Sequence, residues 1–204
     1  TEIYTLSLHD ALPICVDRRP ALARRAEAAL RWLSPDFFAV HPVEADAPEE
    51  DVLLLDQSFL STVAEATLRV PSFSAWLEST DQRPAYTLLR QLLQLLTWQR
   101  GPDRWVLKTP HHLEWLDDLL AVFPDATVVM THRDPLITTA SFCSMVAHGR
   151  GVMSDHVDPA EIGRSWLAKL SRMTERALAA RDARGGLGFL DVRYEDLLAD
   201  PVPT

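Results

Sequence analysis

The sequence lacks several features that define common classes of protein. No glycine precedes Gly101, so neither glycine-rich phosphate loop, G-x-x-x-x-G-K-[ST] or G-x-G-x-x-G, can occur before that position. No apolar run approaches the roughly 18 residues that a membrane-spanning helix needs. The two cysteines, Cys15 and Cys143, are too few for a disulfide framework and have no metal-ligand spacing. They fit a reducing, cytoplasmic setting.

Basic residues are also in short supply. The chain has 20 Lys and Arg against 29 Asp and Glu, which gives a formal net charge of −9 at pH 7. Binding nucleic acid through bulk charge requires a basic surface, so nucleic acid is not an expected partner. An anionic ligand would instead be held by a few individually placed basic groups. The hydrophobic content of 47% indicates one ordinary globular domain with a real core.

The two ends of the chain differ from its middle. Residues 1–14 (TEIYTLSLHDALPI) resemble the translation of a short-read sequencing adapter, and a native strand or an atypical leader is the alternative. We therefore leave residues 1–14 out of the functional interpretation. We expect residues 15–204 to be a partial domain whose true N-terminus is missing. The ending DPVPT closes no element, which indicates a cut there as well.

Hydrophobic periodicity divides the chain into alternating helices and strands. Helical spacing predicts helices over residues 18–33, 85–99, 112–122 and 136–147, and one that begins after Asp158 and ends at Gly185-Gly186. Short apolar segments predict buried strands over residues 104–107, 127–131 and 188–193. Residues 41–51 are expected to form an exposed acidic loop, 71–78 a turn, and 148–157 a loop. This alternation predicts an α/β fold with a parallel sheet and crossover helices.

Candidate functional residues follow the predicted strands, because ligands of parallel sheets bind at the carboxyl ends of the strands. Lys108 follows the first strand and can neutralise a transferring anionic group, although a solvated lysine in a turn is the alternative. Arg133 follows the second strand at the start of a helix, where its planar fork suits phosphate. Tyr194 follows the third strand. Ser141, eight residues after Arg133, is either a phosphate ligand or a small packing residue.

The histidines indicate acid–base chemistry rather than metal binding. His111 and His112 are adjacent, so on a helix they point about 100° apart and do not chelate one ion together. Either can be a general base, or a helix cap and a packed imidazole. His148 and His156 have no partner at ligand spacing, so we expect no metal. A serine-nucleophile elbow is excluded because G-x-S-x-G is absent.

Four segments together resemble one family. The segment RWVLKTPHHLEWLDDLLAVFPDATVVMTHRDPLITTASF (104–142) is similar to bacterial-type sulfotransferases, which use 3′-phosphoadenosine 5′-phosphosulfate (PAPS) as donor. HPVEADAPEED (41–51), residues 71–86 with Trp76, and VRYEDLLADP (192–201) extend the resemblance over nearly all of residues 21–201. The resemblance implies a P-loop NTPase-like sulfotransferase fold, here lacking its first strand and phosphate loop. It also implies transfer of a sulfuryl group to a hydroxyl or amine of a small-molecule or carbohydrate acceptor, without a metal.

The resemblance assigns roles to particular residues. Arg133 and Ser141 match the pair that holds the 3′-phosphate of the donor, and Tyr194 matches a residue near the bound nucleotide. Lys108 matches a lysine that assists transfer of the sulfuryl group. Sulfuryl transfer should pass through a loose, in-line transition state like that of phosphoryl transfer, in which positioning and charge stabilisation are the enzyme's tasks.

Departures from the family pattern leave the base and the activity open. Cytosolic sulfotransferases place a histidine two residues after the lysine, where this chain has Pro110. The base is His111, which we favour, or His112, or a Glu or His from a region upstream. The 5′-phosphosulfate loop and a late basic loop are absent, so we expect this piece to be inactive alone. A non-catalytic nucleotide-binding module and a P-loop-related kinase are the alternatives.

Overall fold

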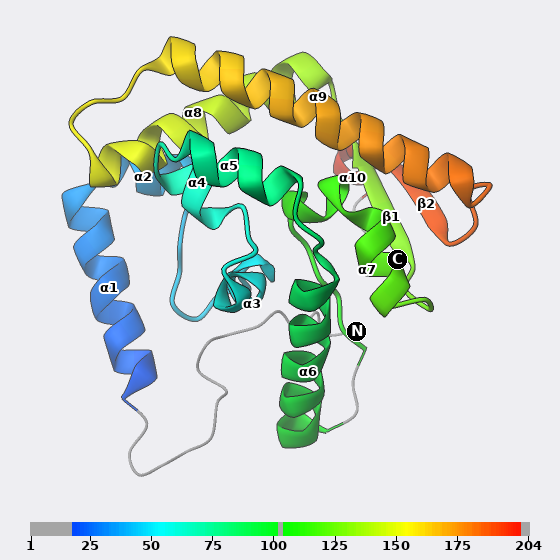
Figure 1. Ribbon diagram of the computed structural model, residues 1–204. Helices are drawn as coiled ribbons and strands as arrows, with labels where there is room; N and C mark the ends of the chain where they lie inside the picture. Colours follow the sequence, from blue (N-terminus) through cyan, green and yellow to red (C-terminus); the bar gives the residue numbers. More distant parts are fainter. Residues whose placement is uncertain (1–17, 102–103, 201–204) are drawn as a thin grey trace.

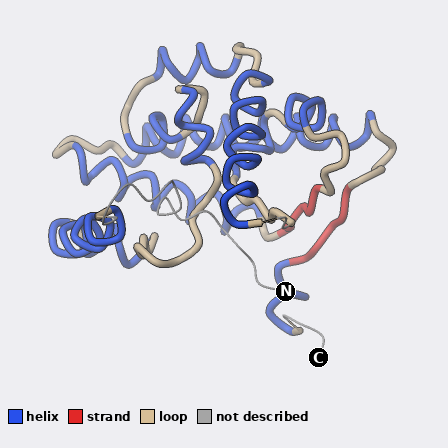
Figure 2. Tube along the Cα trace, turned by 90° about the horizontal axis from the view of Figure 1, so that it is seen from below, coloured by secondary structure: helices blue, strands red, loops and turns tan. Residues whose placement is uncertain are grey.

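The protein is mostly helical, with one pair of strands at one end (Figures 1 and 2). The computed structural model describes residues 18–101 and 104–200. The elements, in chain order, are α1 (Arg19–Leu33), α2 (Pro35–Val40), α3 (Val52–Leu55), η2 (Asp56–Ser58), α4 (Val63–Thr67), α5 (Pro71–Glu78), α6 (Arg83–Arg100), η3 (Pro110–Glu114), α7 (Leu116–Val122), β1 (Val128–His132), α8 (Pro135–Met153), α9 (Pro159–Ala183), β2 (Phe189–Arg193) and α10 (Tyr194–Ala199). Residues 1–14 and Cys15 lie outside the described residues, so the adapter interpretation stays a prediction.

The two strands are parallel, as predicted, and are joined through α8 and α9. Val128 pairs with Phe189 at one end and His132 with Arg193 at the other. This register places the carboxyl ends of β1 and β2 level with each other. The following residues, Arg133 and Tyr194, therefore leave the sheet side by side.

The strands are less buried than predicted. Met130 is buried, where β1 packs with α7 and α9, whereas Val129 is 55% and Leu190 56% exposed. Among the described residues the sheet has only two strands, and most of their side chains are partly or fully exposed to solvent. Apolar runs predict a strand well but not how fully the surrounding elements cover it.

The predicted strand over residues 104–107 is not formed in the described structure. The segment keeps a strand-like alternation, with Trp105 and Leu107 turned towards the core and Val106 49% exposed. No described strand lies beside it to complete a ladder, and a strand is defined by those hydrogen bonds. The sequence predicted the strand-like pattern of this segment correctly. Whether it forms a strand depends on a neighbouring strand, which its own sequence does not reveal.

The main core forms around α6, whose helical stripe was predicted. Tyr86, Leu89 and Leu93 are buried at helical spacing, and Leu77 of α5 packs with them. Leu95, which lies off this face, is 45% exposed. Burial therefore favours the positions three and four residues apart along one narrow face.

Helices α5 and α8 correct two loop predictions. Residues 71–78 form a helix rather than a turn, because Pro71 stands at its first position, which suits proline. Helix α8 continues to Met153 instead of ending at residue 147. A side chain added at Gly149 would come 3.4 Å from the ring of Phe37, so this glycine lets α2 pack closely on α8.

Helix α9 begins as predicted and runs across the molecule above the strands (Figure 1). The Asp158 carboxylate accepts hydrogen bonds from the backbone N–H groups of Ala160 and Glu161, 2.9 and 3.2 Å away. The Glu161 side chain does not complete a capping box but contacts Arg150 at 3.1 Å. Asp158 is therefore the N-cap of α9, and the Glu161 carboxylate serves a contact with another helix instead of the cap.

Candidate active site

Arg133 and Tyr194 form the first part of the candidate site, at the carboxyl ends of β1 and β2. The Arg133 guanidinium carbon lies 4.5 Å from the centre of the Tyr194 ring, within the range of a cation–π contact. Both residues are named in the sequence analysis, and the parallel register is what brings them together. An aromatic face does not neutralise the guanidinium, so Arg133 keeps its full charge at an exposed strand end.

Hydrogen bonds of Asp191 connect the ends of the two strands with each other and with α9. Asp191 of β2 accepts a hydrogen bond from His132 of β1 at 2.7 Å and from Arg181 of α9 at 2.8 Å. The hydrogen bond from His132, and then Arg181, lowers the pKa of the Asp191 carboxyl. Local patterns could not have found Asp191, because its partners lie on β1 and α9.

The start of helix α8 is partly occupied by the protein itself. The Asp134 carboxylate accepts from the N–H groups of Leu136 and Ile137, 2.8 and 3.3 Å away. These two donors are therefore capped by the chain itself. Ser141 lies on an exposed part of α8, and its side chain makes no hydrogen bond within the described residues. The structure shows no contact between Ser141 and Arg133.

Lys108 forms the second part of the site, together with an acidic loop that the sequence analysis left unassigned. Its side chain is 74% exposed, and its ammonium makes an ion pair with Glu50. Glu50 belongs to the loop at residues 41–51, which the family resemblance includes without giving it a role. No hydrogen bond, ion pair or ring contact among the described residues joins the Lys108 group to the Arg133 group.

His111 and His112 differ sharply in their surroundings. His111 is 1% exposed, and its ring lies 4.4 Å from that of Trp115, measured between centroids. Burial lowers the pKa of His111 well below its usual value. This placement favours the packed-imidazole alternative over the general base that we expected at this position. His112 is partly exposed, with Nε2 3.1 Å from Asp51 Oδ2 and Nδ1 3.1 Å from the Tyr86 hydroxyl.

A buried ionic network holds the segment that carries these histidines. Glu114, the last residue of η3, is fully buried, and its carboxylate meets Lys169 at 3.3 Å, Arg172 at 2.7 Å and Arg176 at 3.3 Å, all from α9. Lys169 also meets Glu65 of α4 at 2.5 Å. The turn after Lys108 is thereby fixed to the longest helix of the protein.

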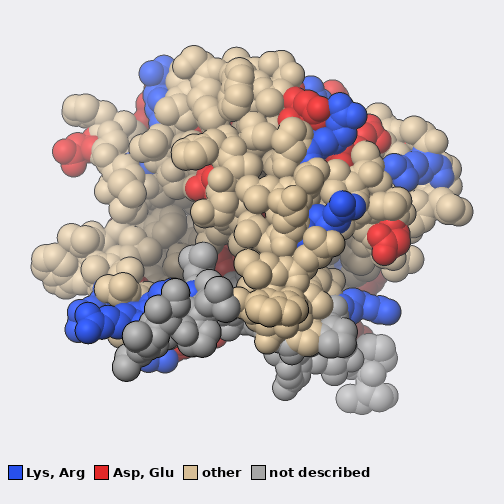
Figure 3. Space-filling model, turned by 60° about the horizontal axis from the view of Figure 1, so that its bottom comes forward, with Lys and Arg blue, Asp and Glu red and all other residues tan. Residues whose placement is uncertain are grey.

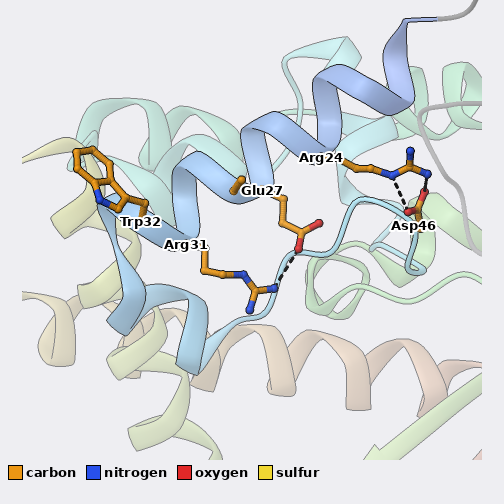
Figure 4. A pocket seen from close by; sticks show the side chains of 6 residues that line it. Arg24, Glu27, Arg31, Trp32 and Asp46 are labelled. Atoms are coloured by element: carbon orange, nitrogen blue, oxygen red, sulfur yellow. Dashed lines mark hydrogen bonds and ion pairs between the residues drawn. The ribbon is translucent and has the colours of Figure 1, made fainter.

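A surface hollow of about 540 Å³ lies between α1 and the acidic loop, away from these groups. Figure 4 shows Arg24 turned towards Asp46 and Arg31 towards Glu27, and these pairs lie 3.1 and 3.0 Å apart. Both arginines are thus already neutralised, and the hollow contains none of the predicted site residues. It does not have the character of an anion site.

The basic side chains of the face drawn in Figure 3 are scattered in small groups among acidic and uncharged ones. Within residues 18–101 and 104–200, no three His, Cys, Asp or Glu side chains are arranged to hold a metal ion. Over the same residues, no helix is both long and apolar enough to span a membrane.

The described structure is thus an α/β protein with a parallel strand pair that ends in an exposed arginine beside a tyrosine. The sequence model of the Sulfotransferase family matches residues 4–204, and the chain belongs to that family. Sulfotransferase STF1 from Mycobacterium tuberculosis is similar at 39% identity and a TM-score of 0.73, over 87% of this chain and 52% of that one. STF9 from Mycobacterium avium is similar at 27% identity and a TM-score of 0.78, over 91% of this chain and 48% of that one.

The resemblance to bacterial-type sulfotransferases is thereby confirmed, together with their α/β fold. The chain spans about half the length of these solved structures. A search of curated proteins finds no significant match.

Proposed function

We propose that the protein carrying this chain transfers a sulfuryl group from PAPS to a hydroxyl or amine of a small-molecule or carbohydrate acceptor. The observation that supports this most directly is the placement of Arg133 against Tyr194 at the level ends of two parallel strands. A guanidinium held on an aromatic face is pre-oriented for a phosphate, and its fork can bind two phosphate oxygens.

In this proposal the residues divide the work along the donor. Arg133 and Ser141 bind its 3′-phosphate, and Tyr194 lies beside the nucleotide. Lys108 donates to the sulfuryl oxygens as charge moves onto the leaving phosphate. Placing charged donors where charge develops is worth roughly 2–4 kcal/mol of barrier per contact. Since Ser141 does not touch Arg133, the donor's phosphate would be what bridges the two.

The first test is direct binding. Isothermal titration calorimetry should show that the chain binds adenosine 3′,5′-bisphosphate more tightly than adenosine 5′-monophosphate, which lacks the 3′-phosphate. Equal affinity for the two nucleotides would contradict the assignment of Arg133 and Ser141.

The second test is turnover. In the full-length protein that carries this chain, labelled PAPS should transfer its label to at least one member of a panel of sugars, phenols and lipids. Binding without any transfer would favour the nucleotide-binding module, and phosphate transfer from ATP would favour the kinase.

A further inference from the structure

Two successive residues of the acidic loop touch the segment that follows residues 104–107. Glu50 pairs with Lys108, and Asp51 meets His112. The loop at residues 41–51 lies far from this segment in the sequence, so these two contacts define how it folds back onto the site. A carboxylate is therefore in contact with the lysine assigned to sulfuryl transfer.

Asp51 is the anchor of this arrangement. It is 2% exposed, and its Oδ2 lies 3.1 Å from His112 Nε2. The other ring nitrogen of His112 lies 3.1 Å from the hydroxyl of Tyr86, which is fully buried in α6. His112 Nδ1 is thus within hydrogen-bond distance of Tyr86, whereas its Nε2 meets Asp51 only at ion-pair distance. Asp51 and Tyr86 act on the site by positioning.

Glu50 is placed differently from its neighbour. Its side chain is 21% exposed, and the Lys108 side chain it meets is 74% exposed, so solvent or an acceptor reaches this pair. An ammonium has three N–H donors, so Lys108 can contact a sulfuryl oxygen while it keeps Glu50 as a partner. Two groups that share one ammonium lie within about 6 Å of each other. An acceptor hydroxyl that approaches the sulfur from the side of Glu50 can therefore hydrogen-bond to its carboxylate.

We propose that Glu50 is the general base of the reaction, an assignment that rests on the proposed function. The acceptor hydroxyl gives its proton to the Glu50 carboxylate as its oxygen forms a bond to sulfur. The bond between sulfur and the bridging oxygen of PAPS breaks, and its electron pair leaves with adenosine 3′,5′-bisphosphate. Glu50 then releases the proton to solvent. In this proposal His111, which is buried, and His112, which lies between Asp51 and Tyr86, take no part in the transfer.

The fold does not depend on the Glu50 pair, so the role can be tested by substitution. Exposed ion pairs contribute about 0–1 kcal/mol, and Asp51 anchors the loop independently. Glu50→Gln should therefore unfold at nearly the same urea concentration as the unchanged protein. Glu44→Gln is the matched control, since Glu44 is an exposed residue of the same loop.

The decisive measurement compares two acceptors of different acidity, with PAPS as donor. With phenol, which must lose a proton during transfer, Glu50→Gln should lower kcat/KM about 10²- to 10⁴-fold, the usual contribution of a general base. With 4-nitrophenol, at a pH where it is already ionised, the loss should be only a few-fold. Glu44→Gln should match the unchanged protein with both acceptors, and Glu50→Gln should bind adenosine 3′,5′-bisphosphate normally.

The outcomes separate the two proposals. An equal loss with both phenols, or none with either, would overturn the assignment of Glu50 and leave sulfuryl transfer intact. Tighter binding of PAPS by Glu50→Gln with unchanged kcat would show that Glu50 only competes with the donor for Lys108. All of these variants are made in the full-length protein that carries this chain. If the unchanged full-length protein binds no adenosine 3′,5′-bisphosphate and transfers no label, the proposed function fails, and the role of Glu50 fails with it.

Discussion

Replacing Lys169 by methionine should destabilise the protein strongly, because this lysine is the buried centre of an ionic network. Its side chain is 6% exposed and lies 2.5 Å from Glu65 and 3.3 Å from Glu114, both of which are buried. Methionine fills a similar volume and can pack against Trp115 and Trp166, whose rings lie 5.8 Å from the ammonium. The substitution therefore isolates the loss of charge.

The expected loss in free energy of unfolding depends on the two glutamates that remain buried after the substitution. Removing one partner of a buried ion pair costs about 3–5 kcal/mol, since the other charge stays buried without compensation. Glu114 keeps Arg172 and Arg176, but Glu65 loses its only ion-pair partner among the described residues. We therefore expect about 3 kcal/mol. For a protein of this size that lowers Tm by about 6–12 °C.

The chain offers a matched control in its only other lysine, Lys108, which is also paired with a glutamate but is exposed. Lys108→Met should cost no more than about 1 kcal/mol in urea denaturation. Combining Lys169→Met with Glu65→Gln should cost less than the sum of the two, because the pair is lost only once. Additive effects, or equal costs for the two lysines, would refute this reasoning.

Three further predictions concern the site. Arg133→Ala should weaken binding of adenosine 3′,5′-bisphosphate by about 1.5–3 kcal/mol in calorimetry and spare adenosine 5′-phosphosulfate, which lacks the 3′-phosphate; an equal loss for both would contradict its role. Lys108→Ala should lower kcat more than it raises the donor KM, whereas a pure KM effect would assign it to ground-state binding. Burial lowers the pKa of His111, so below about pH 6.5 the unfolded chain binds a proton that the folded chain does not. Stability should therefore fall by up to about 1.4 kcal/mol per pH unit there, and His111→Leu should flatten this slope in urea denaturation at pH 5.5 to 7. An unchanged slope would exclude His111 as its source.

The features that were predictable from the sequence are those with a local physical cause. The cap at Asp158 and the parallel pairing of β1 and β2 follow from short-range patterns. The missing strand at residues 104–107 and the extension of α8 past Gly149 were not predictable. A strand needs a partner strand, and the segment from 148 to 153, with two glycines and a histidine, has no local pattern that favours a helix.

The candidate site divides in the same way. Lys108 follows a segment that forms no strand in the described structure, whereas Arg133 and Tyr194 could be placed at strand ends because hydrophobic runs mark where strands stop. Glu50 and Asp51 could not, because the residues they meet lie far along the chain, 58 positions away for Glu50 and Lys108. The residues on either side of Glu50 in the sequence do not indicate which distant residue it will pair with. Long-range charge pairing is therefore what the structure adds to the sequence.

The two cations of the site have different kinds of partner, and this difference predicts different roles. The Tyr194 ring leaves the charge of Arg133 intact, so that charge is fully available to a phosphate in the ground state. Lys108 shares its charge with the Glu50 carboxylate, which offsets part of its attraction for the donor before reaction. In the proposed reaction Glu50 would lose its negative charge on taking a proton, and the full charge of Lys108 would then act on the sulfuryl group. Arg133 should therefore govern affinity, and Lys108 the rate of the chemical step.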